Sequence, residues 1–337
     1  MIDNDIHVEE LELICADSIR IAAQRWTPKT THPSAHLRPK KRILCVHGVL
    51  DNCRSFYFLI PYLLSRMNQY YQIDVVALDL PGHGLSSHYS SDHVPNHEDF
   101  VYYIEEALSA LKWDGKEPLT VIGHSLGSAI LVVYAATFPE RVEVFVNLDG
   151  FGPNYEPEDD LITVLRMHID KRKKLNKRRQ SNGVSENKIY PNFQAAVQAR
   201  KQTALHSPGN QWLSHKAAIE IVQRAVRTVR DGDEAVQFRH DPRFMWPPLC
   251  PYTLEQAFVR FSSIRCPVYW LRAQNGWPFK KDILERAERL LQPEAVCILP
   301  GSHHFHADPE TALQTAQEVE KCLMKGWNLS LKQQSKL

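Results

Sequence analysis

The pentapeptide GHSLG (residues 123–127) places Ser125 between two glycines. The apolar segment 119–124 precedes it and predicts a buried strand, and the Ala-rich segment 126–138 predicts a helix. A serine in a tight strand–turn–helix is typical of a nucleophile elbow, in which the glycines make room for neighbouring backbone. We therefore predict that Ser125 attacks a carbonyl carbon and forms an acyl-enzyme.

A serine nucleophile needs a general base, and histidine serves this purpose at neutral pH. Of the 16 histidines in the chain, three cluster in the segment GSHHFHAD (residues 301–308), between the last predicted strand and the last predicted helix. We favour His303, which directly follows the Gly-Ser turn, as the base. His304 is the alternative, and we expect His306 to brace the loop.

A carboxylate is expected to orient the histidine, and its usual place is after the last strand but one, here the segment PVYWLRA (residues 267–273). The sequence there is QNGWP (residues 274–278), which holds no acid. Asp149, at the end of the apolar segment 142–149, is the favoured acid. Asp282 is an alternative, and so is an arrangement without a carboxylate, either a Ser-His dyad or an amide such as Asn275.

Two backbone N–H groups are needed to stabilise the oxyanion of an acyl-transfer reaction. By position, these are the N–H of Leu126, directly after the nucleophile, and that of Val49, after the His47-Gly48 turn. We expect His47 to shape this turn rather than to act as a base. We also expect the turn DLPGHG (residues 79–84) to be structural.

Strand-like and helix-like segments alternate over most of the chain, which predicts an α/β fold with a mostly parallel, eight-stranded sheet flanked by helices. The alternation stops after the sixth strand, and we predict that residues 151–250 form a helical cap over the carboxyl edge of the sheet, where ligands bind in such folds. The predicted core is 1–150 with 251–328, followed by a tail, 329–337. Within the cap, the basic run KRKKLNKRR (171–179) is expected to be a solvated helix face, with acyl-CoA phosphates as a candidate ligand. Three aromatic residues are equally compatible with the cap–core cleft and with plain core: Phe244, Trp246 and Trp277.

Composition excludes several classes of function. Lys and Arg total 40 and Asp and Glu total 39, so no net charge draws the chain to nucleic acid. The longest apolar stretch, residues 129–138, is about half the length of a membrane span. Seven cysteines without a C-x-x-C pair are expected to be reduced thiols, and no metal-ligand spacing or cofactor motif is present. We expect no cofactor and no metal.

Together these segments resemble the α/β-hydrolase superfamily over nearly the whole chain, and most closely the serine hydrolase-like proteins, which are related to haloalkane dehalogenases and epoxide hydrolases. The matching segments are HGVLDNCRSF (47–56), DLPGHGLSSHY (79–89), GHSLG (123–127), NLDGFGP (147–153), RHDPRF (239–244) and GSHHFH (301–306). The resemblance implies an α/β-hydrolase fold, Ser125 as nucleophile, Asp149 as acid and His303 as base, with His306 as the second histidine of its loop.

Dehalogenases and epoxide hydrolases carry an aspartate nucleophile, so Ser125 points away from both chemistries and towards acyl transfer. The expected function is hydrolysis of a carboxylic ester or thioester, with acyl-CoA as one candidate substrate. A non-catalytic ligand-binding or sensing protein is the alternative.

The sequence ends in Ser335-Lys336-Leu337, and a terminal S-K-L is an address read by the peroxisomal import receptor. The N-terminal segment lacks the basic and apolar regions of a secretory signal. We expect the protein in peroxisomes, with the cytosol as a second location.

Overall fold

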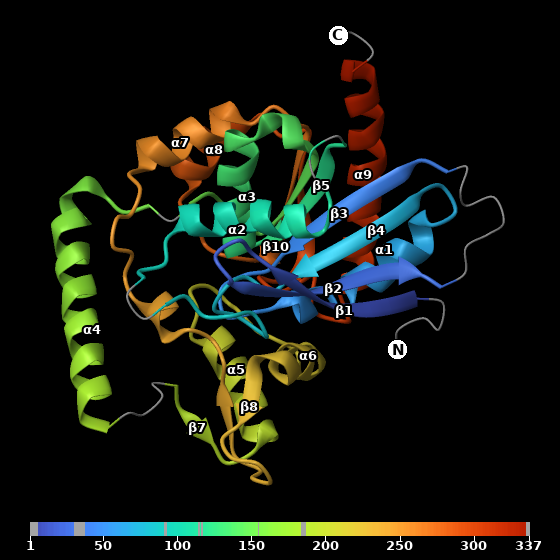
Figure 1. Ribbon diagram of the computed structural model, residues 1–337. Coiled ribbons are helices and arrows are strands. Elements are labelled where there is room, and N and C mark those ends of the chain that lie inside the picture. Colours follow the sequence, from blue (N-terminus) through green and yellow to red (C-terminus); the bar gives the residue numbers. More distant parts are fainter. Residues whose placement is uncertain are drawn as a thin grey trace.

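A central sheet of eight strands organises the molecule in this computed structural model, which describes residues 6–29, 38–90, 93–113, 115, 117–153, 155–182 and 187–334 (Figure 1). In spatial order the strands are β1 (Ile6–Ile14), β2 (Arg20–Pro28), β4 (Gln72–Leu78), β3 (Lys40–Val46), β5 (Leu119–His124), β6 (Val142–Leu148), β10 (Val268–Asn275) and β11 (Ala295–Ser302). The first two strands run antiparallel, and β4 to β11 are mutually parallel. The mostly parallel, eight-stranded α/β sheet predicted from the sequence is confirmed.

Helices cover both faces of this sheet. One face packs against α1 (Leu59–Met67) and α9 (Ala312–Gln334), and the other against α2 (His97–Ala110), α3 (Leu126–Thr137), α7 (Leu254–Ser263) and α8 (Lys281–Leu291). Alternate residues of each strand enter opposite cores: Val121 of β5 packs on the α3 side, and the next residue, Ile122, on the α9 side. Continuous apolar runs therefore form the inner strands, because both faces are buried.

Residues between β6 and α7 form a separate layer at the sheet edge (Figure 1). Three helices dominate this layer: α4 (Leu161–Asn182), α5 (Phe193–Leu205) and α6 (His215–Ala225). The sequence did not predict the small antiparallel sheet in this layer, in which β7 (Ile189–Tyr190), β9 (Val236–Phe238) and β8 (Val226–Thr228) pair. Strands of two or three residues are too short to show an alternating apolar pattern.

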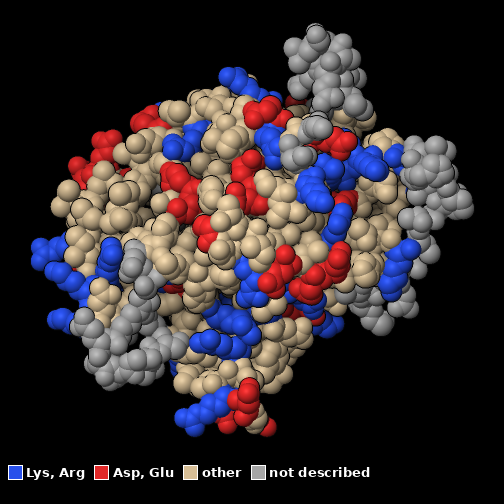
Figure 2. All heavy atoms as spheres, viewed as in Figure 1, with Lys and Arg blue, Asp and Glu red and all other residues tan. Residues whose placement is uncertain are grey.

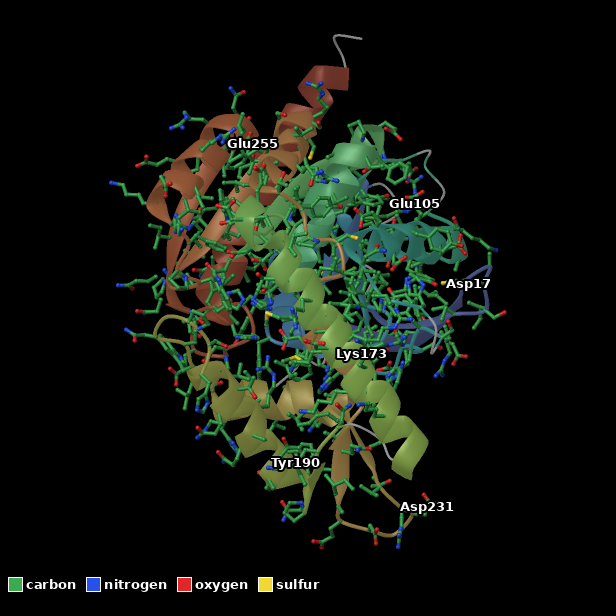
Figure 3. All side chains as sticks on the ribbon, turned by 90° about the vertical axis from the view of Figure 1, so that its left-hand side faces the viewer. Asp17, Glu105, Lys173, Tyr190, Asp231 and Glu255 are labelled. Atoms are coloured by element: carbon green, nitrogen blue, oxygen red, sulfur yellow. The ribbon has the colours of Figure 1, made fainter. Side chains whose placement is uncertain are left out.

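Helix α4 forms the outer side of the cap, and Figure 3, which looks onto this side, labels Lys173 on it. Basic side chains (blue) gather there in the space-filling view (Figure 2). The side chains of residues 171–174 are exposed, as expected for a solvated face. The side chains of residues 178 and 179, at the end of the basic run, lie outside the described residues.

The C-terminal helix is longer than the sequence predicted. We expected a tail from residue 329 onwards, but α9 begins at Ala312 and continues to Gln334. Residues 329–334 are therefore helical, and only residues 335–337 of the predicted tail lie outside the described residues. All seven cysteines are unpaired, as expected.

Candidate active site

Ser125 occupies a sharp turn between β5 and α3, with a φ of 51°. Positive φ values are costly for residues with a side chain and persist only where the surrounding structure enforces them. Its flanking glycines are required by close packing: a Cβ on Gly127 would lie 2.0 Å from the carbonyl oxygen of Val46, and one on Gly123 would lie 2.7 Å from the Cα of Ser128. The spacing of the GHSLG motif thus follows from the contacts of the turn.

Asp149 follows the last residue of β6 and also has a positive φ, 47°. Its side chain is almost fully buried and points to three donors. Oδ1 accepts a hydrogen bond from the N–H of Ala273 at 3.0 Å, and Oδ2 accepts one from the N–H of Trp277 at 3.0 Å. Oδ2 also lies 2.6 Å from Nδ1 of His303. The structure therefore brings Asp149 and His303 into direct contact.

Gly276, in the turn after β10, leaves room for the carboxylate of Asp149. A Cβ at this position would lie 2.4 Å from Oδ1 of Asp149, so the turn after β10 must stay small to admit a carboxylate from the neighbouring strand. The two alternatives are placed elsewhere. Asp282 is exposed in the first turn of α8, and Asn275, half-buried at the end of β10, is not among the residues that line the active-site cavity.

The three histidines of the loop after β11 differ in their partners. His303 contacts Asp149, whereas Nε2 of His304 lies 3.3 Å from Oδ2 of a different carboxylate, Asp51. His306 is fully buried. Within the described residues, no hydrogen bond joins Oγ of Ser125 to the imidazole of His303, although both residues line the same cavity. Such bonds are often long in structures without substrate and tighten when substrate binds.

The Asp149–His303 contact fixes the protonation of both groups. Burial opposes ionisation of Asp149, but hydrogen bonds from His303, Ala273 and Trp277 together hold the pKa of its carboxyl below the ordinary value. An ionised carboxylate only accepts hydrogen bonds, so Nδ1 of His303 must carry the proton that it donates. Its Nε2 is then free to accept a proton in the neutral imidazole.

The predicted oxyanion donors also lie at this site. Val49 and Leu126 both line the cavity, and neither backbone N–H has a hydrogen-bond partner elsewhere in the described part of the chain. The Leu126 N–H is the first of helix α3, where unpaired donors point outward. His47 braces the turn before Val49, as predicted: Nδ1 donates to the carbonyl of Gly48 at 2.7 Å, and Nε2 accepts from the N–H of Leu80 at 2.9 Å.

A cavity of about 660 Å³ lies between the sheet edge and the cap, and Ser125 and His303 line it. Its walls are largely apolar, and they include all three aromatic residues that the sequence left undecided between cleft and core: Phe244, Trp246 and Trp277. Helix α4 contributes Met167, His168 and Lys171. The cavity is of the size and character that suit a small organic ligand.

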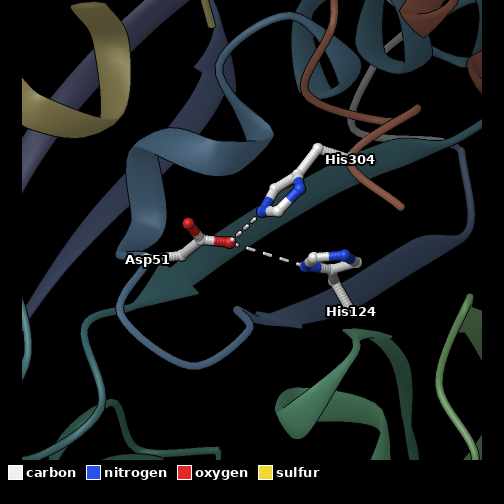
Figure 4. Close-up of side chains that lie close together, drawn as sticks. All are labelled: Asp51, His124 and His304. Atoms are coloured by element: carbon white, nitrogen blue, oxygen red, sulfur yellow. Dashed lines mark ion pairs between the residues drawn. The ribbon is translucent and has the colours of Figure 1, made fainter. Parts of the chain in front are cut away.

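A second polar cluster, in the wall of the cavity, was not predicted. Oδ2 of Asp51 lies 3.3 Å from Nε2 of His304 and 3.6 Å from Nδ1 of His124 (Figure 4). Arg200, from cap helix α5, donates to Oδ1 of Asp51 at 2.6 Å, and its Nη2 lies 3.1 Å from Nε2 of His304. Sequence reasoning missed this cluster because 149 residues separate Arg200 from Asp51. The histidine inside GHSLG was a weak signal for it.

Asp51, His124 and His304 offer three ligand atoms within 4.8 Å of one another, which is compact enough for a metal ion. However, the guanidinium of Arg200 already faces both Asp51 and His304. A dication at these atoms would lie beside a fixed positive charge, which Coulomb repulsion opposes in a buried site. We therefore interpret the cluster as a buried ion pair with two histidines.

Comparison with known proteins identifies the family. Residues 41–309 match the family model described as alpha/beta hydrolase fold. The chain belongs to the α/β-hydrolase fold family, as the resemblance implied, and the eight-stranded sheet with helices on both faces agrees with this assignment. None of the described helices is both long enough and apolar enough to traverse a bilayer.

Relatives with serine hydrolase-like names match most of the chain. Serine hydrolase-like protein 2 of Homo sapiens is 34% identical over 317 residues, which cover 90% of this chain and 91% of the human protein. A serine hydrolase-like protein of Dictyostelium discoideum is 27% identical, covering 96% of this chain and 83% of its own length. The resemblance to this group is thus confirmed.

Solved structures agree on the fold. A hypothetical protein from Pseudomonas aeruginosa superposes with a TM-score of 0.76 at 27% identity, covering 94% of this chain and 99% of that one. The thioesterase domain from the curacin biosynthetic pathway superposes with a TM-score of 0.72 over 95% of this chain and 99% of that domain. At 18% identity, the second likeness shows the fold alone.

Proposed function

We propose that this α/β hydrolase is a serine hydrolase that cleaves a carboxylic ester or thioester through an acyl-enzyme. The observation that carries the proposal is the meeting of two features at one cavity. Ser125 is held in a strained turn, and the paired side chains of His303 and Asp149, 2.6 Å apart, line the same space. The serine hydrolase-like names of the relatives support the same chemistry.

The proposed reaction follows from the orientation of these groups. Nε2 of His303 takes the hydroxyl proton as Oγ of Ser125 attacks the carbonyl carbon, and Asp149 stabilises the resulting imidazolium. The N–H groups of Val49 and Leu126 hold the oxyanion. Collapse of the tetrahedral intermediate breaks the bond to the leaving group, which takes the proton from His303. Water then repeats the sequence and releases the acid.

The cavity favours an acyl chain over a highly polar substrate. Its walls include Phe151, Trp246, Leu249 and Phe279. Both arginines among its described lining residues already have carboxylate partners, since Arg200 pairs with Asp51 and Arg243 pairs with Asp241. A cavity with largely apolar walls binds its ligand chiefly through buried apolar area. Thioesters such as acyl-CoA therefore belong in the same test as simple esters.

The test is turnover of p-nitrophenyl esters and acyl-CoA thioesters of increasing chain length by the purified protein. Wild type should turn over at least one series, and Ser125→Ala should lose about 10³-fold or more, because the acyl-enzyme cannot form. Ser262→Ala, which removes an exposed serine on α7, is the matched control and should match wild type. A folded wild type without turnover on any substrate would reject the proposal and favour a ligand-binding protein.

We also propose that the protein is imported into peroxisomes through Ser335–Leu337, a tripeptide that lies outside the described residues. A fluorescent fusion at the N-terminus leaves this signal free. The fusion should be punctate and coincide with a peroxisomal marker, and deletion of the three residues should make it diffuse. A diffuse signal from the intact fusion would reject the proposal.

A further inference from the structure

Arg200 connects the cap to both loops that carry the reaction. Its side chain is buried on cap helix α5, and Nη2 alone reaches Oδ1 of Asp51 at 2.6 Å and Nε2 of His304 at 3.1 Å. Asp51 is two residues after Val49, in the loop of the predicted oxyanion donor, and His304 directly follows His303. One cap side chain therefore touches the oxyanion loop and the histidine loop together.

In the described core, two histidines, His124 and His304, face Asp51, and no lysine or arginine does. His124 lies beside it, but Nε2 of His124 faces the carbonyl oxygen of His303 at 2.9 Å and must donate a proton there. Burial lowers the pKa of His124 to about 3, so its imidazole is neutral and Nδ1 carries no proton. That bare Nδ1 faces Oδ2 of Asp51, and neither atom has a hydrogen-bond partner. Among the described lysines and arginines, Arg200 is the one that pairs with Asp51.

A second cap residue, Gln211, contacts the histidine loop after β11. Oε1 of Gln211, between α5 and α6, accepts a hydrogen bond from the N–H of His303 at 2.9 Å, and its Nε2 donates to the carbonyl of Gly276 at 2.8 Å. The loop that carries the base is thus held by the cap at His303 and at His304. The oxyanion loop reaches the cap through Asp51, which pairs with Arg200, and through Asn52, whose Nδ2 donates to the carbonyl of Ile221 at 2.8 Å.

We propose that Arg200 is a positioning residue through which the docked cap completes the active site, an inference that rests on the proposed serine-hydrolase function. It holds Val49 and His303 in register by fixing Asp51 and His304. Displacements of about 1 Å among reacting groups cost about 10²-fold in rate. Loosening both loops should therefore lower the rate of chemistry while leaving substrate binding in the apolar cavity largely intact.

Arg224 provides a matched control. It is also a cap arginine, on α6, and it is as buried as Arg200, with 6% and 7% of their surfaces exposed. Nε of Arg224 donates to Asp79 at 2.7 Å, and Nη1 donates to Glu10 at 2.7 Å. Arg224 pairs the cap with the core away from the active-site cavity. Its removal tests what the loss of a buried cap–core ion pair does by itself.

The experiment compares Arg200→Met with Arg224→Met. Active sites are first counted with a fluorophosphonate, so that kcat refers to labelled Ser125 and misfolded protein is discounted. Both variants should unfold at lower temperature. Arg200→Met should lose about 10- to 100-fold in kcat with KM within threefold of wild type, since only the positioning of reacting groups is lost. Arg224→Met should keep kcat within twofold.

The pH profile gives a readout that a purely structural role would not move. Burial lowers the pKa of His304, Asp51 raises it, and Arg200 and His303 lower it further. The remaining neighbours that bear on this ring are His124 and His306. Without Arg200, His304 should take up a proton closer to neutral pH. The kcat/KM profile of Arg200→Met should therefore gain an ionisation on its acid side that wild type and Arg224→Met lack.

Hydrogen exchange separates this inference from the proposed function. Peptides spanning 47–52 and 301–306 should exchange faster in Arg200→Met than in Arg224→Met, whether or not the protein turns over an ester. A wild type that neither labels nor hydrolyses would defeat the proposed function alone. A wild type that labels, together with an Arg200→Met variant of unchanged kcat and unchanged exchange, would overturn the positioning role.

The double variant Arg200→Met/Asp51→Asn covers the case in which Arg200→Met fails to fold. Removing one partner leaves an uncompensated buried charge, whereas removing both does not, so the double variant should be the more stable of the two. It still lacks the contact of one cap side chain with both loops. We expect the same 10- to 100-fold loss of kcat, and a double variant with the kcat of wild type would overturn the inference.

Discussion

Replacing Asp149 with asparagine changes one atom of a side chain whose two oxygens both accept backbone hydrogen bonds. Oδ1 accepts from Ala273, and Oδ2 accepts from Trp277 and His303. If the new amide NH₂ group takes the place of Oδ1, it faces the N–H of Ala273, donor against donor. If it takes the place of Oδ2, it donates to Nδ1 of His303, which moves the histidine proton to Nε2.

Both orientations are costly, and the second abolishes the base. An Nε2 that carries the proton cannot accept one from Ser125, so kcat should fall by about 10³- to 10⁴-fold. At about 1.36 kcal/mol per factor of ten, this loss corresponds to about 4–5.5 kcal/mol of transition-state stabilisation. The first orientation keeps the tautomer but leaves a buried N–H unsatisfied, which costs about 1–3 kcal/mol of folding stability.

The assay is burst-phase hydrolysis of the best p-nitrophenyl ester, with active sites counted by fluorophosphonate labelling. Asp149→Asn should label slowly and turn over with the stated loss. Asp282→Asn is the control, since this exposed carboxylate on α8 comes after β10, the strand that the catalytic acid usually follows. A loss smaller than tenfold for Asp149→Asn, or a larger loss for Asp282→Asn, would refute the assignment of the acid.

Two further predictions follow from the packing of the site and from its buried histidines. Gly276→Ala places a Cβ 2.4 Å from Oδ1 of Asp149, so the carboxylate must move. Steady-state kinetics should show kcat reduced about 10- to 100-fold. An unchanged kcat would mean that the turn adapts. His124, with a folded-state pKa of about 3, cannot take up the proton that the unfolded chain binds below pH 6.5. Its contribution to stability is complete above pH 6.5 and falls by about 1.4 kcal/mol per pH unit as acid is added. Four other buried histidines have lowered pKa values and add to this loss: His47, His83, His304 and His306. Urea unfolding should therefore show at least about 2 kcal/mol less stability at pH 5 than at pH 7, and a flat dependence would contradict the neutral burial of these rings.

Local sequence patterns predicted most of the fold and, within the candidate site, the segment around Ser125. The strand, the turn and the helix around Ser125 are adjacent in sequence, so their interpretation needed no knowledge of tertiary contacts. The proximity of Asp149 to His303 could be expected because β6 and β11 flank β10 in the sheet and their carboxyl ends share one edge. Their catalytic roles remain predictions.

The cap shows where sequence reasoning failed and why. Its small sheet has strands of two and three residues, too few for a period to be visible. The link from Arg200 to Asp51 depends on how the cap docks on the core, and an arginine in a polar helix predicts a solvated side chain by default. Likewise, the role of Gly276 depends on a carboxylate from the neighbouring strand and not on its own sequence neighbours.

The most direct test of the central claim is to trap the covalent intermediate. Wild type is mixed with an activated ester, quenched in acid within milliseconds to seconds, digested and analysed by mass spectrometry. We predict a peptide that carries the acyl mass on Ser125. It should be absent from Ser125→Ala and longer-lived in a His303→Ala variant that has been acylated chemically. An acyl group on any other residue, or turnover without acylation of Ser125, would contradict this claim.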